Sequence, residues 1–266
     1  MASVEWTDST IEAAGIKLHL SRAGKGRPVL VLHHETGTLD RLPFYDALAA
    51  HYDVLVPHHP GFSKSQRPDW MRSVRDIAVI YRGLLAHLKL RDAALVGLGF
   101  GGWIAAEMAS MAPADLSHLV LVGAMGIKPP PGDKGGDILD LAITGYVDYA
   151  RAGFHDQKAF DRVYGAEPSI DQLEMWDICR EMSFRIAWKP YMYSQTLPHL
   201  LGAVCKPALV VWGDDDKVVP QSAAKRYVEA LPDARLEIVG NCGHCVDMEQ
   251  PEALAKLVTS FIAQRQ

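Results

Sequence analysis

Two side chains in the C-terminal part of the chain could do acid–base chemistry together. Three aspartates, Asp214 to Asp216, follow the apolar segment 208–212, and His244 follows the next apolar segment, 236–239. If both segments are parallel strands, these side chains lie at the same edge of a sheet. A carboxylate that holds one ring nitrogen of a histidine stabilises the imidazolium and leaves the other nitrogen as a general base. We therefore predict that one of these aspartates forms a catalytic pair with His244.

A glycine-rich turn occupies the place where a nucleophile would complete this pair. Residues 95–103 read LVGLGFGGW, which predicts a strand, a sharp turn and the start of a helix. In the motif G-x-S-x-G, a serine sits exposed on such a turn. Here Gly99 stands at the nucleophile position, and glycine has no side chain that could attack a substrate.

An oxyanion beside this turn would need two backbone N–H groups. Phe100, directly after Gly99, would supply the first. The second is expected from the loop after the apolar segment 29–32, where the chain reads HHETG. We assign it to the backbone N–H of Glu35. The carboxylate of Glu35 would repel an oxyanion unless it points away or is protonated.

Two pairs of adjacent histidines, His33–His34 and His58–His59, also follow strand-like segments. Imidazole is a common metal ligand, and a metal could activate water without a serine. Adjacent residues on an extended backbone point to opposite sides, however, so each pair would supply only one ligand. We therefore expect no metal and no cofactor. We interpret His33 and His34 as residues that pack the loop or bind the substrate.

Strand-like and helix-like segments alternate along most of the chain, which predicts an α/β fold with a mostly parallel, doubly wound sheet. Between residues 125 and 204 the pattern changes to amphipathic helical segments after the chain break at PPPG. We predict a core formed by residues 1–124 and 205–266 and an inserted helical cap formed by residues 125–204. Trp176 and Trp188 in this cap are candidate substrate-binding residues, although each could equally belong to its hydrophobic core.

Together these segments resemble the α/β-hydrolase superfamily over essentially the whole chain, and in particular its capped hydrolases of esters and carbon–carbon bonds. The order nucleophile, acid, histidine is that of the family. Residues 213–220 resemble the family's acid loop and 243–244 its histidine loop, which implies that Asp216 and His244 are the catalytic pair. Further similarity lies in PGFSKS at 60–65, where Ser63 replaces a glycine of the family pattern, and in TLPHLL at 196–201. The resemblance implies hydrolysis of a small ester, thioester or activated carbon–carbon bond.

Glycine at position 99 leaves several interpretations open. The chain could be a hydrolase disabled by loss of its serine, or a hydrolase in which His244 and Asp216 activate water directly. The alternative is a cofactor-free lyase or oxygenase that uses His244 as a base, or a non-catalytic binder of a small molecule. The fold does not decide among them, since one fold hosts many functions.

Composition limits the partners. The 266 residues carry a formal net charge of −5, which gives no basic surface for nucleic acid. The apolar segments are too short to cross a bilayer, and no basic and apolar leader precedes them. We expect a cytoplasmic protein with a small-molecule substrate and neither nucleic acid nor membrane as a partner. Homodimer formation is left open.

Overall fold

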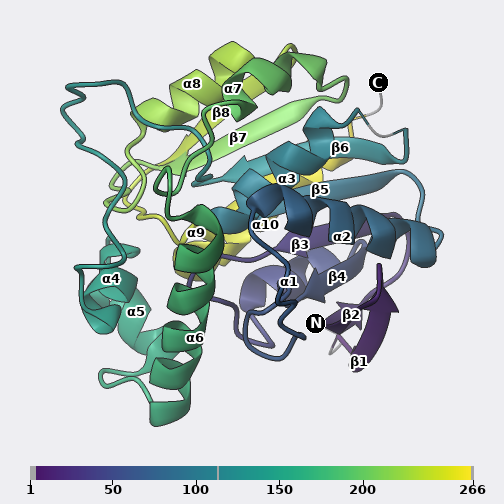
Figure 1. Ribbon diagram of the computed structural model, residues 1–266, viewed down its shortest axis with the longest axis horizontal. Helices are drawn as coiled ribbons and strands as arrows, with labels where there is room; N and C mark the ends of the chain where they lie inside the picture. Colours follow the sequence, from purple (N-terminus) through teal and green to yellow (C-terminus); the bar gives the residue numbers. More distant parts are fainter. Residues whose placement is uncertain (1–3, 113, 265–266) are drawn as a thin grey trace.

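Figure 1 shows the computed structural model, which describes residues 4–112 and 114–264. Eight strands in these residues form one sheet, in the order β1-β2-β4-β3-β5-β6-β7-β8. Neighbours are parallel from β4 to β8 along this order, whereas β2 pairs antiparallel with both β1 and β4. The strands are β1 (Trp6–Ala13), β2 (Ile16–Ala23), β3 (Pro28–Leu32), β4 (Asp53–Pro57), β5 (Ala93–Leu98), β6 (Leu116–Val122), β7 (Ala208–Gly213) and β8 (Ala234–Val239).

Helices cover both faces of this sheet (Figure 1). They are α1 (Pro43–Ala49), α2 (Val74–His87), α3 (Phe100–Ser110), α4 (Tyr146–Ala152), α5 (Gln157–Tyr164), α6 (Ile170–Ala187), α7 (Leu197–Leu200), α8 (Ser222–Ala230), α9 (Val246–Glu249) and α10 (Pro251–Ile262). In β5, Leu95 packs into the core beneath α2, α3 and α8, while Ala94 and Val96 pack into the core beneath α1 and α10. Burial on both faces explains why this strand is apolar at every position. The predicted doubly wound α/β-hydrolase sheet is confirmed.

The stretch between β6 and β7, which is described in full, contains α4 to α7 and a short 3-10 helix (Leu201–Ala203) but no strand of the sheet. In Figure 1, α4, α5 and α6 project together from one end of the sheet. Ser169 caps α6 by accepting a hydrogen bond from the backbone N–H of Gln172. These helices lie within the segment predicted as the cap, and the division at residues 125 and 204 stays a prediction. Among the described residues, we find no helix of the length and apolarity needed to cross a membrane.

The turn between β5 and α3 is held by close backbone contacts. Gly99 adopts a φ of +50°, a region that residues with a side chain rarely occupy. Gly101 lies against β3, because a Cβ atom there would come within 2.1 Å of the Leu32 carbonyl oxygen. The N-terminus of α3 is thereby pressed against the loop that follows β3, which brings the two segments of the candidate site together.

Candidate active site

Asp216 and His244 lie where the sequence predicted them, at the ends of β7 and β8. His244 donates a hydrogen bond from Nδ1 to Oδ2 of Asp216 over 2.8 Å. The other carboxylate oxygen, Oδ1, accepts from the backbone N–H groups of Val218 and Val219 at 2.9 and 2.8 Å. Both side chains are buried. Asp216 is thus fixed by its own loop, and it orients the His244 ring so that Nε2 faces inward.

The side chain of Glu35 fills the space above the β5–α3 turn. Its Oε2 accepts a hydrogen bond from the backbone N–H of Phe100 over 3.4 Å, and its Oε1 accepts from the hydroxyl of Tyr149 over 3.0 Å. Oε1 also lies 3.8 Å from Nε2 of His244. The prediction assigned the backbone N–H of Glu35 to an oxyanion hole. That role stays a prediction, and the carboxylate of Glu35 itself binds the Phe100 N–H group on which that hole would also depend.

A second histidine–aspartate pair faces the first. His34 donates from Nε2 to Oδ1 of Asp247 over 2.8 Å, and both side chains are buried. The His34 and His244 ring centroids are 5.2 Å apart. Within the described residues, neither Nδ1 of His34 nor Nε2 of His244 has a hydrogen-bond partner. Two imidazole nitrogens without a hydrogen-bond partner therefore face the same small space, and each ring is oriented by its own carboxylate.

These groups converge directly above Gly99. A Cβ atom on Gly99 would lie 2.6 Å from Nδ1 of His34, 2.8 Å from Oε2 of Glu35 and 2.9 Å from Nε2 of His244. Distances below 3.0 Å are shorter than real Cβ contacts, so a side chain at position 99 would have to displace at least one of these groups. Glycine at the nucleophile position therefore leaves the space that the side chains of His34, Glu35 and His244 occupy.

The charges in this space favour a cation. Burial lowers the pKa of His244, but the carboxylates of Asp216, Glu35 and Asp247 outweigh burial and raise this pKa to about 9. Burial and the neighbouring Glu35 carboxylate raise the pKa of Tyr149 well above its ordinary value. Tyr149 therefore keeps its proton and acts as a hydrogen-bond donor to Glu35.

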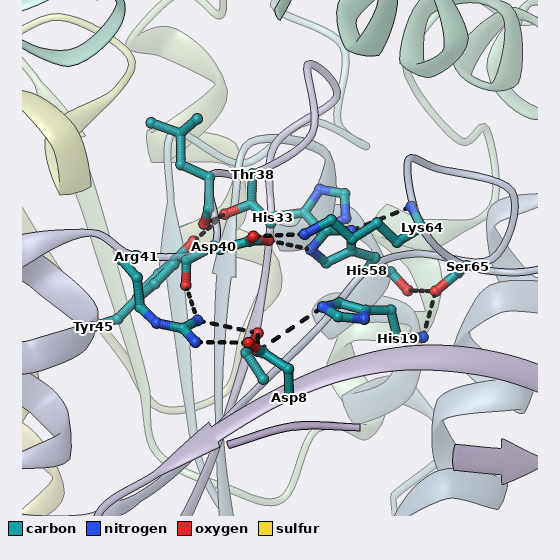
Figure 2. Close-up of polar contacts among 12 residues, drawn as sticks. Asp8, His19, His33, Thr38, Asp40, Arg41, Tyr45, His58, Lys64 and Ser65 are labelled. Carbon is teal, nitrogen blue, oxygen red and sulfur yellow. Dashed lines mark hydrogen bonds and ion pairs between the residues drawn. The ribbon is translucent and has the colours of Figure 1, made fainter. Parts of the chain in front are cut away.

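The other predicted histidine lies elsewhere. His33 is buried and uses both ring nitrogens: Nδ1 donates to the carbonyl of His34 over 2.7 Å, and Nε2 accepts from the backbone N–H of His59 over 2.9 Å. His33 also stacks on the His59 ring. The structure thus makes His33 a packing residue rather than a substrate-binding one. Figure 2 shows His58 pointing toward Asp40, whose carboxylate also binds Lys64.

The two tryptophans of the predicted cap do not line the cavity beside His244. Trp176 is buried and packs against Tyr164, with ring centroids 5.1 Å apart. Trp188 is exposed and lies with Phe184 along a shallow surface depression. The cavity next to His244 is narrow, with room for about one water molecule. Its lining includes Glu35, Thr36, Tyr149, Ala150, Gly153, Phe154, Tyr164, Val218, His244 and Cys245.

Two residues of the site were missed by sequence reasoning. Tyr149 lies on α4, and Asp247 lies on α9, three residues after His244. Neither belongs to a motif, since tyrosine and aspartate are common on helices. The one available signal was indirect: a loop carboxylate such as Glu35, when buried, requires donors, and these must come from elements packed over the loop.

Comparisons with known proteins show the family to which this fold belongs. The family described as "alpha/beta hydrolase fold" matches residues 27–251. A 2-hydroxymuconate semialdehyde hydrolase of Pseudomonas sp. strain CF600 is 27% identical over 272 residues, which span 96% of this chain and 93% of that protein. A 2-hydroxy-6-oxononadienedioate/2-hydroxy-6-oxononatrienedioate hydrolase of Paraburkholderia phymatum is 28% identical and spans 94% of this chain and 92% of that protein.

Among solved structures, a serine hydrolase involved in carbazole degradation superimposes with a TM-score of 0.77 at 22% identity, over 98% of this chain and 100% of that chain. At this identity the structural likeness bears on the fold alone. The family match spans most of the sequence, and it includes the β5–α3 turn and both histidine–aspartate pairs. The chain therefore belongs to the α/β-hydrolase fold family, among its hydrolases.

Proposed function

We propose that this protein hydrolyses a small substrate, at an ester or an activated carbon–carbon bond, by direct attack of water and without a covalent intermediate at position 99. The observation that carries the proposal is the buried pair of Asp216 and His244, with Nε2 of His244 aimed above Gly99. The substrate class comes from the relatives, which are named as hydrolases of 2-hydroxymuconate semialdehyde and related oxo-dienoates.

Water is the nucleophile that remains when the serine is absent. In its neutral form, His244 would take a proton at Nε2 from a water molecule held between it and the Glu35 carboxylate, and because the pKa of His244 is raised to about 9, this step should be favoured at alkaline pH. The water oxygen would bond to the substrate carbonyl carbon, the bond to the leaving group would break with its electron pair, and the proton would pass from His244 to that group. The sum is hydrolysis, and no other reactant is required.

A substrate needs more room than the described conformation gives beside His244. Tyr149 on α4 and Ser183 on α6 both contact Glu35, so the insertion lies directly over the site. In this proposal these helices move apart to admit the substrate and close again around it. Closure would exclude bulk water and leave the one molecule that attacks.

The test is hydrolysis of 2-hydroxy-6-oxo-2,4-heptadienoate and of a short-chain activated ester by the purified protein. We expect turnover that resists a serine-directed fluorophosphonate and falls about 10²- to 10⁴-fold in His244→Gln, the usual contribution of a general base. His87→Gln, an exposed histidine on α2, is the matched control. Equal turnover by His244→Gln and the control would contradict the mechanism. Ligand binding without turnover in any form would favour the non-catalytic binder.

A further inference from the structure

Three ligand-type atoms point into one buried space. Nδ1 of His34, a carboxylate oxygen of Glu35 and Nε2 of His244 all lie within 4.8 Å of one another, and all three residues are buried. We infer that His34, Glu35 and His244 bind a divalent transition-metal ion above Gly99. Two imidazoles and one carboxylate, with further positions open to water, form a ligand set typical of catalytic zinc and non-haem iron sites.

The hydrogen bonds around the cluster prepare both imidazoles as ligands. A metal-binding histidine usually donates its other ring N–H to a carboxylate, which fixes the tautomer and the ring orientation. Asp247 does this for His34 and Asp216 does it for His244, each over 2.8 Å. The two remaining nitrogens are buried and have no hydrogen-bond partner in the described part of the chain. Buried polar atoms are rarely left in this way, and a cation would satisfy both.

Gly99 provides the space that such an ion requires. The three atoms lie 2.6, 2.8 and 2.9 Å from the point where a Cβ atom of residue 99 would be. Ligand distances to zinc are about 2.0–2.2 Å for nitrogen and carboxylate oxygen. Shifts of less than about 1 Å would therefore bring the ligands to a common ion placed slightly farther from the backbone. A serine side chain at position 99 would occupy the same volume.

The charge of the site also calls for a cation. Glu35, Asp216 and Asp247 are three buried carboxylates, and their recorded hydrogen bonds come from histidine, tyrosine and backbone N–H groups. No lysine or arginine among the described residues forms an ion pair with them. Buried carboxylates are costly unless a positive charge offsets them. The His244 ring, whose pKa is raised to about 9, can supply one positive charge as an imidazolium, and a divalent ion in place of its Nε2 proton would supply two at the centre of the group.

A second cluster, His19, Asp40 and His58, has suitable residue types but a different environment. Lys64 lies 2.5 Å from the Asp40 carboxylate, and Asp40 is exposed (Figure 2). Nδ1 of His58 accepts a hydrogen bond from the backbone N–H of Lys64. This carboxylate already has its cation. The cluster therefore serves as an internal control rather than as a competing site.

The chemistry of the ion rests on the proposed function, whereas its binding does not. A bound ion lowers the pKa of its water, so that hydroxide forms near neutral pH. That hydroxide would bond to the substrate carbonyl carbon as the leaving group departs with its electron pair, and the proton released from the water would go to the leaving group. His244 would then serve as a ligand, and the ion would take over the activation of water.

Binding is tested on the purified full chain after treatment with a chelator and its removal. Calorimetry with Zn²⁺ should give one equivalent per chain, Co²⁺ should give a visible d–d spectrum, and Mg²⁺, which prefers oxygen ligands, should not compete. Glu35→Gln and His34→Gln should weaken Zn²⁺ binding at least about 100-fold. Asp247→Asn should weaken it about 10- to 100-fold, as removal of an outer carboxylate does. Asp40→Asn, in the control cluster, should bind as the unmodified protein does.

A variant could lose metal binding because it misfolds, so a second measurement uses the unmodified protein alone. Electron paramagnetic resonance of the Cu²⁺-loaded unmodified protein should show coupling to two imidazole nitrogens. Absence of stoichiometric binding, a Glu35→Gln variant that binds normally, or loss of binding in a folded Asp40→Asn variant would each overturn the inference. If chelator-treated protein binds no Zn²⁺ but hydrolyses the substrate, the metal site is contradicted and the proposed function stands. If the protein binds one equivalent of Zn²⁺ but hydrolyses no substrate, the metal site stands and the proposed function is contradicted.

Discussion

The Glu35 carboxylate and the Phe100 backbone N–H face one another over 3.4 Å, at the N-terminus of α3. This N–H group would stabilise the substrate oxygen in a hydrolase with a serine at the turn. Here a carboxylate of the protein itself binds it, and Gly99 supplies no nucleophile. The two changes belong together, because the Glu35 side chain occupies the space that a side chain on residue 99 would need.

Restoring the missing serine is therefore expected to fail. Gly99→Ser should lower the free energy of unfolding by at least about 1–3 kcal/mol, the cost of a strained backbone, because a Cβ atom would also crowd Glu35 and both histidines. Urea unfolding measures this loss. The variant should gain no esterase activity and should not react with a fluorophosphonate. Stoichiometric labelling of Ser at this position would show that the site can still form a serine nucleophile.

Tyr149→Phe tests how the Glu35 carboxylate is held in place. Loss of the hydroxyl removes a hydrogen bond of 3.0 Å to a buried charged group, so we expect a stability loss of about 1–3 kcal/mol. The expected activity loss is larger in kcat than in KM, because the tyrosine positions a group that acts on water. Tyr52→Phe is the matched control. The Tyr52 hydroxyl contacts the backbone carbonyl of Thr259, away from the site, so its loss should leave kcat unchanged.

Acid should destabilise the fold through its buried histidines. Burial lowers the pKa of His59 to about 3 and that of His58 to about 4, from an ordinary value of 6.5. Below pH 6.5 the unfolded chain binds protons at these two histidines that the folded chain does not bind, so their contribution to stability is full above pH 6.5 and is lost as the pH falls toward 4. Each histidine can contribute up to about 1.4 kcal/mol per pH unit. His58→Asn should give a shallower slope in urea unfolding, whereas His87→Gln should not. An unchanged stability across this range would contradict the assignment.

The cysteines are expected to differ sharply in reactivity. Cys205 is exposed, whereas Cys179, Cys242 and Cys245 are buried, and burial raises the pKa of each of these three thiols. A thiol reagent should therefore modify one cysteine rapidly in the native protein and four after unfolding. Cys205→Ser should abolish the fast reaction. Rapid loss of two thiols through a Cys242–Cys245 disulfide would contradict this expectation and would indicate a redox-active C-x-x-C segment.

Much of the fold and half of the site could be predicted from the sequence. The strand-length apolar segments and the glycines between them are local signals that can be read from the sequence. Gly99, Asp216 and His244 each follow a strand of the parallel part of the sheet, which places them at the same edge. This edge of the sheet brings Asp216 and His244 together. Their hydrogen bond could therefore be predicted without knowing how the insertion between β6 and β7 folds.

The direction of the Glu35 side chain could not be predicted in this way. His34 to Gly37 form a tight turn, in which the Gly37 N–H donates to the His34 carbonyl over 3.1 Å. The alternation expected of an extended chain separates His33 from His34 but no longer applies between His34 and Glu35. Both of these side chains consequently reach the same space. Asp247 depends further on how α9 packs, which no local pattern encodes.

Gly99 and its crowded surroundings also constrain the engineering of this protein. A serine at position 99 would bring its Cβ atom within 3.0 Å of the side chains of His34, Glu35 and His244, so these side chains would have to shift to make room for it. A serine enzyme designed on this scaffold would accordingly need smaller side chains at positions 34 and 35 together with the serine at position 99.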